Sequence, residues 1–358
     1  MASRISEPSR RSVLKSAGGA TAALAAVVLS LSACSTGPAA SATAGTTEKS
    51  AAFPVTIKHA FGETTIKAQP TRVATVSWVN DDIAIALGVI PVGMPKNEWG
   101  NNAKGSTPWK DAALEKAGAA LGTDKAPVQY SEADGINFTE IAKLTPDVIL
   151  AAYSGLSKED YTKLSQIAPV VAYPEIAYGT PWQDATAMIG KALGKDAEAT
   201  QLVKETEALV AEQAAKYPQI KDKTFIYGNL EPAKGDGVNV YSANDNRPRF
   251  LSSIGMTLAP VVAQKSKGSK EFFFPWSAEK ANELDSDVFV TWVPDTTTAE
   301  AITKDPLLSQ IPAVASGALV ADTSNTLTLA ISASSPLSLP WALDTFLPQL
   351  GKAADAVK

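Results

Sequence analysis

Apolar runs of strand length alternate with helix-like stretches from Phe53 to the end of the chain. The stretch RVATVSW at 72–78 predicts a buried strand. The next stretch, NDDIAIALGV at 80–89, predicts a helix with polar residues at its start and Gly88 near its end. Further strands are expected at 90–94, 168–173, 223–230, 287–293 and 317–322, helix then strand at 135–153, strand then helix at 237–256, and a last helix at 335–350. This order predicts α/β architecture.

The longest helical pattern lies in the middle of the chain, between Asp196 and Pro218. Asp196 is placed to cap its start, and Pro218 marks its end. One side of the helix carries charges, and an apolar stripe follows the other side, formed by Leu202, Val203, Leu209 and Val210. We therefore expect a surface helix that packs along one side.

The length after Phe53, about 300 residues, is long for one core and predicts two domains of ordinary size. We expect a first lobe at 53–181, a connecting helical segment at 182–218 and a second lobe at 219–358.

The first 33 residues carry an arginine pair, Arg10 and Arg11, followed by an alanine-rich apolar run at 17–33. A basic start, a short apolar run and small residues before a cleavage point predict an export signal. The run is too short and too rich in Gly and Ala to favour a spanning helix. The arginine pair also resembles a twin-arginine signal, and the sequence leaves the export route open.

Cys34 is the only cysteine, and it ends the tetrad Leu31, Ser32, Ala33, Cys34, which resembles a bacterial lipobox. In such signals the cysteine carries diacylglycerol and becomes the mature N-terminus, so that acyl chains hold the protein at a membrane. A chance cysteine beside an export signal is the alternative. A disulfide within the chain is excluded because there is no second cysteine. The small, polar residues 34–52 predict a flexible tether.

Charge narrows the range of partners. The leader holds four of the 32 basic and one of the 37 acidic residues, which leaves the mature chain with a net charge of −8. This acidity argues against nucleic acid and against an anionic membrane surface as partners. We therefore expect membrane contact only through the lipid anchor.

Two segments echo each other, FTEIAKLTPDVIL from Phe138 and SAEKANELDSDVFV from Ser277. Each carries a glutamate early in a helical stretch, Glu140 or Glu279, and an aspartate directly before a β-branched strand. The echo indicates an internal repeat, although helix followed by strand is common enough to arise by chance.

These patterns together resemble the substrate-binding lipoproteins of iron–siderophore importers, a periplasmic binding protein group that also contains cobalamin-binding proteins. The resemblance covers Phe53 to Leu350 and is carried by FPVTIKHAFGETTIKAQPTRVATVSW, ALGVIPVGM, FTEIAKLTPDVIL and SSIGM. It implies two Rossmann-like α/β lobes joined by one long helix, with a ligand cleft between the lobes. It also implies capture of a ferric siderophore and its delivery to an ABC-type permease for iron uptake.

The resemblance also gives a role to the repeated glutamates. In this family one exposed glutamate on each lobe docks onto arginines of the permease, and Glu140 and Glu279 fall at those positions. Charge pairing of this kind would orient a symmetric permease over the two lobes. The alternative is an ordinary solvated glutamate, or one that favours a helix N-terminus.

Ligand-binding residues are expected on loops after strand ends, because open α/β sheets bind ligands there. The candidates in the first lobe are Trp78, Asn80, Lys96, Trp99, Tyr130 and Tyr153, and those in the second are Tyr241, Asn246, Arg247, Arg249, Trp276, Trp292 and Trp341. Aromatic walls suit the amide and hydrocarbon shell of a siderophore. A tryptophan near a strand end is as often part of the core.

Arg247 is the strongest candidate, because a guanidinium matches carboxylate, catecholate or hydroxamate oxygens with paired hydrogen bonds. A solvent-facing arginine at a helix start is the alternative. Asp81 and Asp82 would oppose a strong anion if they faced the cleft, which favours a neutral or weakly cationic hydroxamate-type complex or a mixed ligand. His59 is the only histidine, so we expect no protein ligand to metal and no cofactor, with iron arriving as a chelated Fe(III) complex.

Alternatives of function stay open at this point. The same fold could bind another chelate such as cobalamin or haem. A lipid-anchored extracytoplasmic hydrolase would have to build a Ser-His-Asp arrangement around His59, or use a pair of carboxylates to hydrolyse a glycoside. A scaffold or adhesion protein would have no closed cleft. The sequence contains no phosphate loop or dinucleotide fingerprint. We expect a monomeric binding protein that is not an enzyme.

Overall fold

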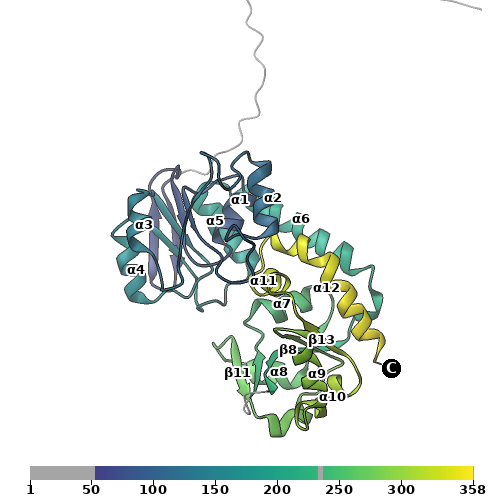
Figure 1. The fold of residues 1–358 in the computed structure, drawn as a ribbon. Helices are drawn as coiled ribbons and strands as arrows, with labels where there is room; N and C mark the ends of the chain where they lie inside the picture. The colour runs from purple at the N-terminus through teal and green to yellow at the C-terminus, as the bar shows by residue number, and fades with distance from the viewer. Residues whose placement is uncertain (1–52, 233–236, 358) are drawn as a thin grey trace, which may run out of the picture. The chain divides into compact units, whose positions relative to one another are not determined.

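The computed structural model describes residues 53–232 and 237–357 (Figure 1). The predicted export signal at 1–33, the tether at 34–52 and the lipidation site Cys34 lie outside these residues. The described residues all belong to one compact unit, so the lobe boundaries expected at 181 and 218 stay predictions.

The first sheet contains five parallel strands in the order β5-β4-β3-β6-β7. The chain starts at the central strand, runs outward, and returns to the other side of the centre. Neighbouring strands β3 and β6 therefore send their connections in opposite directions, which makes their carboxyl ends the switch point where such sheets bind ligands. The strands are β3 (Val73–Thr75), β4 (Gly93–Pro95), β5 (Val128–Tyr130), β6 (Val148–Ala151) and β7 (Val170–Ala172).

Both faces of this sheet are covered, because successive side chains of a strand point to opposite faces. In β6, Val148 and Leu150 join one apolar cluster, and Ile149 and Ala151 join a second one. Helices α1 and α5 contribute to the first cluster, and α3 and α4 to the second. A continuous apolar strand such as VILA is what two covered faces require.

The remaining elements of the first lobe precede or connect these strands. An antiparallel hairpin of β1 and β2 comes first and contacts β7. The bounds are β1 (Val55–His59), β2 (Gly62–Ile66), α1 (Asn80–Ala86), α2 (Pro108–Lys116), α3 (Phe138–Lys143), α4 (Lys158–Ser165) and α5 (Trp182–Leu193). We call this group, built on the first sheet, the first lobe.

The second sheet has six strands, with the path β11-β9-β8-β12-β13 and β10 beside β8. Strands β8, β10, β12 and β13 run parallel, whereas β9 and β11 run antiparallel to their neighbours. The sequence pattern did not predict this antiparallel arm. The strands are β8 (Thr224–Leu230), β9 (Val238–Tyr241), β10 (Thr257–Leu258), β11 (Phe273–Trp276), β12 (Val288–Trp292) and β13 (Leu319–Asp322).

Helices cover the second sheet and complete the second lobe. They are α7 (Asn246–Ser253), α8 (Pro260–Ser266), α9 (Thr296–Lys304), α10 (Pro312–Ala315), α11 (Asn325–Ser332) and α12 (Ser338–Asp355), with short 3₁₀ helices at Pro218–Ile220, Ala278–Glu283 and Leu308–Gln310. The predicted α/β architecture with two lobes is confirmed. Within the described part of the chain, no helix has the length and apolar character needed to cross a membrane.

The long helix predicted in mid-chain is α6 (Asp196–Ala214), which follows the first sheet and precedes the second. Figure 1 shows it running beside α12, and it also packs against α5. Its buried residues are Ala199, Thr206, Val210 and Ala214, so the predicted one-sided packing is confirmed. The predicted cap is wrong, because Asp196 is the first helical residue and Lys195 before it makes no side-chain cap hydrogen bond.

The sequence echo corresponds to a repeated structural unit. Asp147 precedes β6, and its Oδ2 accepts hydrogen bonds from the backbone N–H and hydroxyl of Thr71, at 2.7 and 2.9 Å. Asp287 precedes β12, and its Oδ2 accepts the same two bonds from Thr224, at 2.7 and 2.8 Å. Each aspartate thus ties the start of its own strand to the start of the neighbouring strand, β3 or β8.

Candidate functional site

The switch point of the first sheet is held together by Asn80, the first residue of α1. Its Nδ2 donates to the carbonyl oxygens of Val76 and Tyr153 at 2.8 and 2.9 Å, and its Oδ1 accepts the N–H of Tyr153 at 3.1 Å. Asn80 is fully buried. The loops after β3 and β6 are therefore fixed to each other, and they present Trp78 and Tyr153 at the carboxyl edge of the sheet.

The two lobes meet along this edge. The Tyr153 hydroxyl lies 3.4 Å from the Ser332 carbonyl oxygen at the end of α11. Arg249 of α7 donates through Nη1 to the Gly179 carbonyl at 2.7 Å. Trp99, after β4, meets Trp292 at the end of β12 with ring centres 5.8 Å apart and nearly perpendicular planes. Four of the predicted residues therefore join loops of the first lobe to the second lobe.

Arg247 forms a tightly paired charged group in this region. Asp245 caps α7 by accepting the Arg247 N–H, and its two carboxylate oxygens accept Nε and Nη2 of the same guanidinium, both at 2.7 Å. The guanidinium carbon lies 3.3 Å from the centre of the Tyr241 ring. Burial lowers the pKa of Arg247, but the Asp245 carboxylate outweighs it and the net shift is upward. The guanidinium is thus charged, stacked on Tyr241 and fixed by Asp245.

This group lies close to the first lobe. Burial, and next the Asp245 carboxylate, raise the pKa of the Tyr153 hydroxyl. Burial also raises the pKa of Tyr241, while Arg247 opposes that shift. Asn246 is buried beside them, and its Nδ2 has no hydrogen-bond partner among the described residues. Predicted residues of both lobes therefore converge on a shared polar centre.

Aromatic side chains that sequence reasoning missed surround the centre. Tyr178, on the loop after β7, lies 6.0 Å from the Tyr153 ring, 6.3 Å from Trp78 and 6.5 Å from Phe272 of the second lobe. Trp78, Tyr178 and Phe273 are among the most exposed large apolar side chains, at 43, 38 and 37%. Tyr178 follows a strand end, so the rule used for the other candidates could have found it. The aromatic run FFF at 272–274 was the available signal for Phe272 and Phe273.

The structure places other predicted residues elsewhere. Tyr130 belongs to the core of the first sheet, where its hydroxyl donates to the Thr75 carbonyl. Trp276 donates through Nε1 to the Lys280 carbonyl, on the edge strand β11. Lys96 is exposed beside Gly105, and Trp341 packs against Trp109 with ring centres 5.1 Å apart. These four do not join the Arg247 group.

Asp81 and Asp82 are buried, so they do not oppose an anionic ligand in the way that the sequence suggested. Both carboxylates are buried, and the Lys110 ammonium lies 2.5 Å from Asp81 Oδ2 and 3.6 Å from Asp82 Oδ1. Asp82 Oδ2 also accepts the Trp109 indole N–H at 2.6 Å and the Ser335 hydroxyl at 2.8 Å. The two carboxylates are therefore paired with groups inside the protein.

The repeated glutamates differ in their surroundings. Glu140 on α3 pairs with Lys143 at 2.6 Å and keeps 41% of its side chain exposed. Glu279 is exposed in the 3₁₀ helix Ala278–Glu283 rather than in an α-helix. Docking onto a permease stays a prediction for both residues.

Two cavities lie at the carboxyl edges of the sheets. One of about 670 Å³ is bounded by Asn229, Leu230, Trp292 and Pro294, at the ends of β8 and β12. Its volume is that of a small-molecule pocket. The other, of about 250 Å³, lies in the first lobe next to Tyr178.

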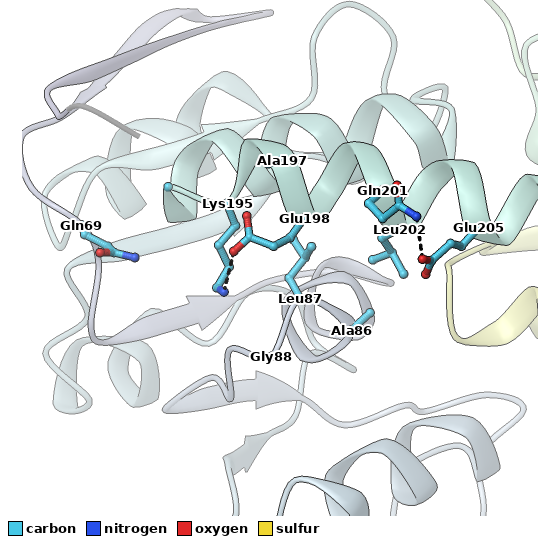
Figure 2. Close-up of a pocket in the computed structure, with 11 residues that line it drawn as sticks. Gln69, Ala86, Leu87, Gly88, Lys195, Ala197, Glu198, Gln201, Leu202 and Glu205 are labelled. Atoms are coloured by element: carbon cyan, nitrogen blue, oxygen red, sulfur yellow. Dashed lines mark hydrogen bonds and ion pairs between the residues drawn. The ribbon is translucent and has the colours of Figure 1, made fainter. Parts of the chain in front are cut away.

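A cavity of about 900 Å³, larger than these two, lies away from the strand edges, between α6 and the end of α1 (Figure 2). Four of its polar side chains form two pairs, Lys195 with Glu198 at 3.2 Å and Gln201 with Glu205 at 2.7 Å, and Gln69 donates to the Leu193 carbonyl at 3.2 Å. We place the candidate site at the strand edges, where unpaired polar groups and exposed rings gather, and not in this larger hollow. Among the described residues, no three His, Cys, Asp or Glu side chains are grouped as metal ligands.

Comparison with known proteins identifies the family. Residues 73–326 match the family described as periplasmic binding protein. The chain is similar to the crystal structure of PiaA from Streptococcus pneumoniae TIGR4, solved in complex with ferrichrome, with 36% identity and a TM-score of 0.79 over 85% of this chain and 99% of that one.

Two curated relatives share less sequence. The ferric enterobactin-binding periplasmic protein FepB of Escherichia coli O6:H1 is 23% identical over 74% of this chain and 83% of its own length. The Fe(3+)-citrate-binding protein YfmC of Bacillus subtilis is 23% identical over 72% of this chain and 74% of its own length. The chain therefore belongs to the periplasmic binding protein family, as its sequence predicted.

Proposed function

We propose that this chain is the substrate-binding component of an ABC importer that captures a ferric siderophore and delivers it to the permease for iron uptake. The observation that carries the proposal is the group of Arg247, Asp245 and Tyr241, which faces Tyr153 and Tyr178 across the contact between the lobes. The likeness to a protein crystallised with ferrichrome supports the same ligand class.

The site suits a complex whose iron is already chelated. A guanidinium has five N–H donors, and Asp245 accepts one from Nε and one from Nη2. In this proposal the remaining donors of Arg247 bind hydroxamate or carboxylate oxygens of the ligand. The exposed rings of Trp78, Tyr178 and Phe273 offer apolar area to the organic shell. In this proposal the protein supplies no ligand to iron and needs no cofactor.

The proposal includes no catalysis. His59, the only histidine, ends β1, where its Nε2 lies 2.9 Å from the Thr64 hydroxyl and its ring packs 5.0 Å from Tyr161. Burial lowers its pKa, and Lys158 adds to the shift. A histidine held in this hairpin is badly placed to serve a nucleophile at the carboxyl edges.

We further propose that the chain acts as a monomer on the extracytoplasmic face of the membrane. Its lipobox-like tetrad supports anchoring by acyl chains on Cys34. Glu140 and Glu279, one on each lobe, would then dock onto the permease.

The test is a binding screen with the purified mature chain. Tryptophan fluorescence is followed while ferric hydroxamate, ferric catecholate, ferric citrate and cobalamin are added. We expect saturable quenching by a ferric siderophore, and recovery of the complex chemically unchanged. No saturation with any ferric complex, or turnover of the ligand, would contradict the proposal.

One pair of variants ties the binding to the site. Arg247→Lys keeps the charge but loses the stacked fork, so we expect the affinity to fall about tenfold to a hundredfold. Arg72→Lys makes the same change at the amino end of β3 and should leave the affinity unchanged.

A further inference from the structure

The cavity of about 250 Å³ in the first lobe is built from loops at the carboxyl edge of its sheet. The residues that line it include Ser77, Glu132, Ser154, Gly155, Asp160 and Tyr178. Pockets that bury a whole drug-sized ligand measure about 300–1,000 Å³. This cavity is therefore suited to one arm of a ligand whose body lies outside it.

Glu132 is an incompletely paired carboxylate in this cavity. Its Oε2 accepts the Ser77 N–H at 2.9 Å. Its Oε1 is buried and has no hydrogen-bond partner among the described residues. A buried carboxylate oxygen without a partner is costly, and a ligand that donates to it recovers that cost.

The other polar groups of the cavity also favour a donor. The Ser154 hydroxyl donates to the Ala151 carbonyl at 2.8 Å, which leaves its oxygen free to accept. Asp160 adds a second carboxylate, whose Oδ2 is held by the Ser157 hydroxyl at 2.6 Å. None of the lining side chains is Lys, Arg or His. Burial raises the pKa of Glu132 to about 7, as expected for a carboxyl group that lacks a nearby cation.

The cavity adjoins the candidate ligand site through Tyr178. The ring of Tyr178 lies directly over Gly155, where an added Cβ would come within 2.2 Å of its Cε2. The same ring also has Trp78 and Phe272 as neighbours, with ring centres 6.3 and 6.5 Å away. A ligand seated against these rings can extend an arm into the cavity.

We infer that this cavity binds a positively charged primary amine arm of the siderophore, with Glu132 Oε1 as its counter-ion. The inference rests on the proposed function and specifies the ligand as a hydroxamate-type chelate that carries a free ammonium group. A charge-assisted hydrogen bond to this incompletely paired carboxylate supplies the selectivity.

The experiment compares two ferric linear trihydroxamates that differ only at one end, a free primary amine or the same amine acetylated. Each is titrated against the wild-type mature chain, Glu132→Gln and Asp134→Asn, with tryptophan fluorescence as the readout. Glu132→Gln retains an oxygen for the Ser77 N–H and removes the charge. Asp134 is exposed on the same loop, so Asp134→Asn controls for net charge.

We expect the wild type and Asp134→Asn to bind the amine complex about tenfold more tightly than the acetylated one. Glu132→Gln should bind both complexes equally, with the same affinity that the wild type has for the acetylated complex. Retained binding of the acetylated complex also shows that this variant is folded. Equal affinities in the wild type, or a preference that persists in Glu132→Gln, would overturn the inference. If neither complex binds the wild type, the inference is overturned. The proposed function is overturned as well only if no other ferric complex binds in the screen.

Discussion

At the scale of single residues, Lys110 carries its ammonium into a buried site between two carboxylates. Its side chain is 4% exposed, and those of Asp81 and Asp82 are 2 and 4% exposed. Desolvation alone would lower the pKa of Lys110, but the two carboxylates outweigh it and the net shift is upward. Such a group stabilises the folded state only while all three side chains are present. A buried charge that loses its partner is compensated neither by water nor by an opposite charge.

Lys110→Met should therefore destabilise the protein strongly. Removing one partner of a buried ion pair costs about 3–5 kcal/mol, since an uncompensated charge is left behind. Lys104→Met is the matched control, because Lys104 is 60% exposed and its ion pair with Asp111 spans 3.6 Å. An exposed pair contributes at most about 1 kcal/mol. The free energies of unfolding in urea test the difference, and equal losses in the two variants would contradict this account.

Asp82 makes the stability depend on pH. Burial raises its pKa from 3.8 to about 6, Lys110 opposes the shift, and Asp81 adds to it. The folded state therefore binds the proton more tightly than the unfolded state between these values. The contribution of Asp82 to stability is larger below this window and is lost as the pH rises through it.

We expect the wild type to lose stability relative to Asp82→Asn as the pH rises from 4 to about 6.5. Asn cannot titrate, so the difference between the two unfolding free energies isolates this group. A difference that stays constant across the range would show that Asp82 does not titrate there.

At the scale of elements, the repeated unit explains why an aspartate recurs before β6 and β12. The carboxylate satisfies the first N–H and the hydroxyl of a threonine at the start of the neighbouring strand, Thr71 or Thr224. Two parallel strands are thus aligned at their amino ends. The recurring aspartate therefore has a structural role. The recurring glutamate, Glu140 or Glu279, makes no contact among the described residues that aligns the strands.

Asp287→Ala should cost about 1–3 kcal/mol of stability, because two hydrogen bonds to a carboxylate are lost at the start of β8. Asp285→Ala removes an exposed carboxylate two residues earlier and should be within about 0.5 kcal/mol of the wild type. Urea unfolding measures both. Ligand affinity should not change in either variant, since these residues lie at the amino ends of the strands. A loss in Asp285→Ala as large as that in Asp287→Ala would count against the unit.

At the scale of the whole molecule, contacts between the lobes are formed by loops far apart in the sequence. Arg249 reaches Gly179, and Ser335 reaches Asp82. A permease that recognises both lobes would need one feature on each, and the repeated unit supplies Glu140 and Glu279. Both side chains are accessible in the structure.

The double variant Glu140→Ala with Glu279→Ala should keep its ligand affinity and lose most uptake in cells that depend on this importer. The reason is that surface charge pairs guide docking without contacting the ligand. Glu159→Ala with Glu283→Ala is the control, because it removes one exposed glutamate near each position. Unchanged uptake in the first variant would remove the docking role.

The sequence by itself determined the α/β class, the family and the strand ends at which a ligand site could form. The class and the strand ends follow from local periodicity, which requires only that each strand or helix bury its apolar face. The family follows from the resemblance of particular stretches such as FTEIAKLTPDVIL. Tertiary structure decided which polar residues face the site. Asp81, Asp82 and Tyr130 follow strand ends in the sequence, as Tyr153 does, yet they are buried. Lys110 pairs with Asp81, and Ser335 donates to Asp82. The Tyr130 hydroxyl donates to the Thr75 carbonyl. The antiparallel arm of β9 and β11, which brings Phe272 toward Tyr178, likewise depends on pairing between distant segments, and local pattern carries no record of such pairing.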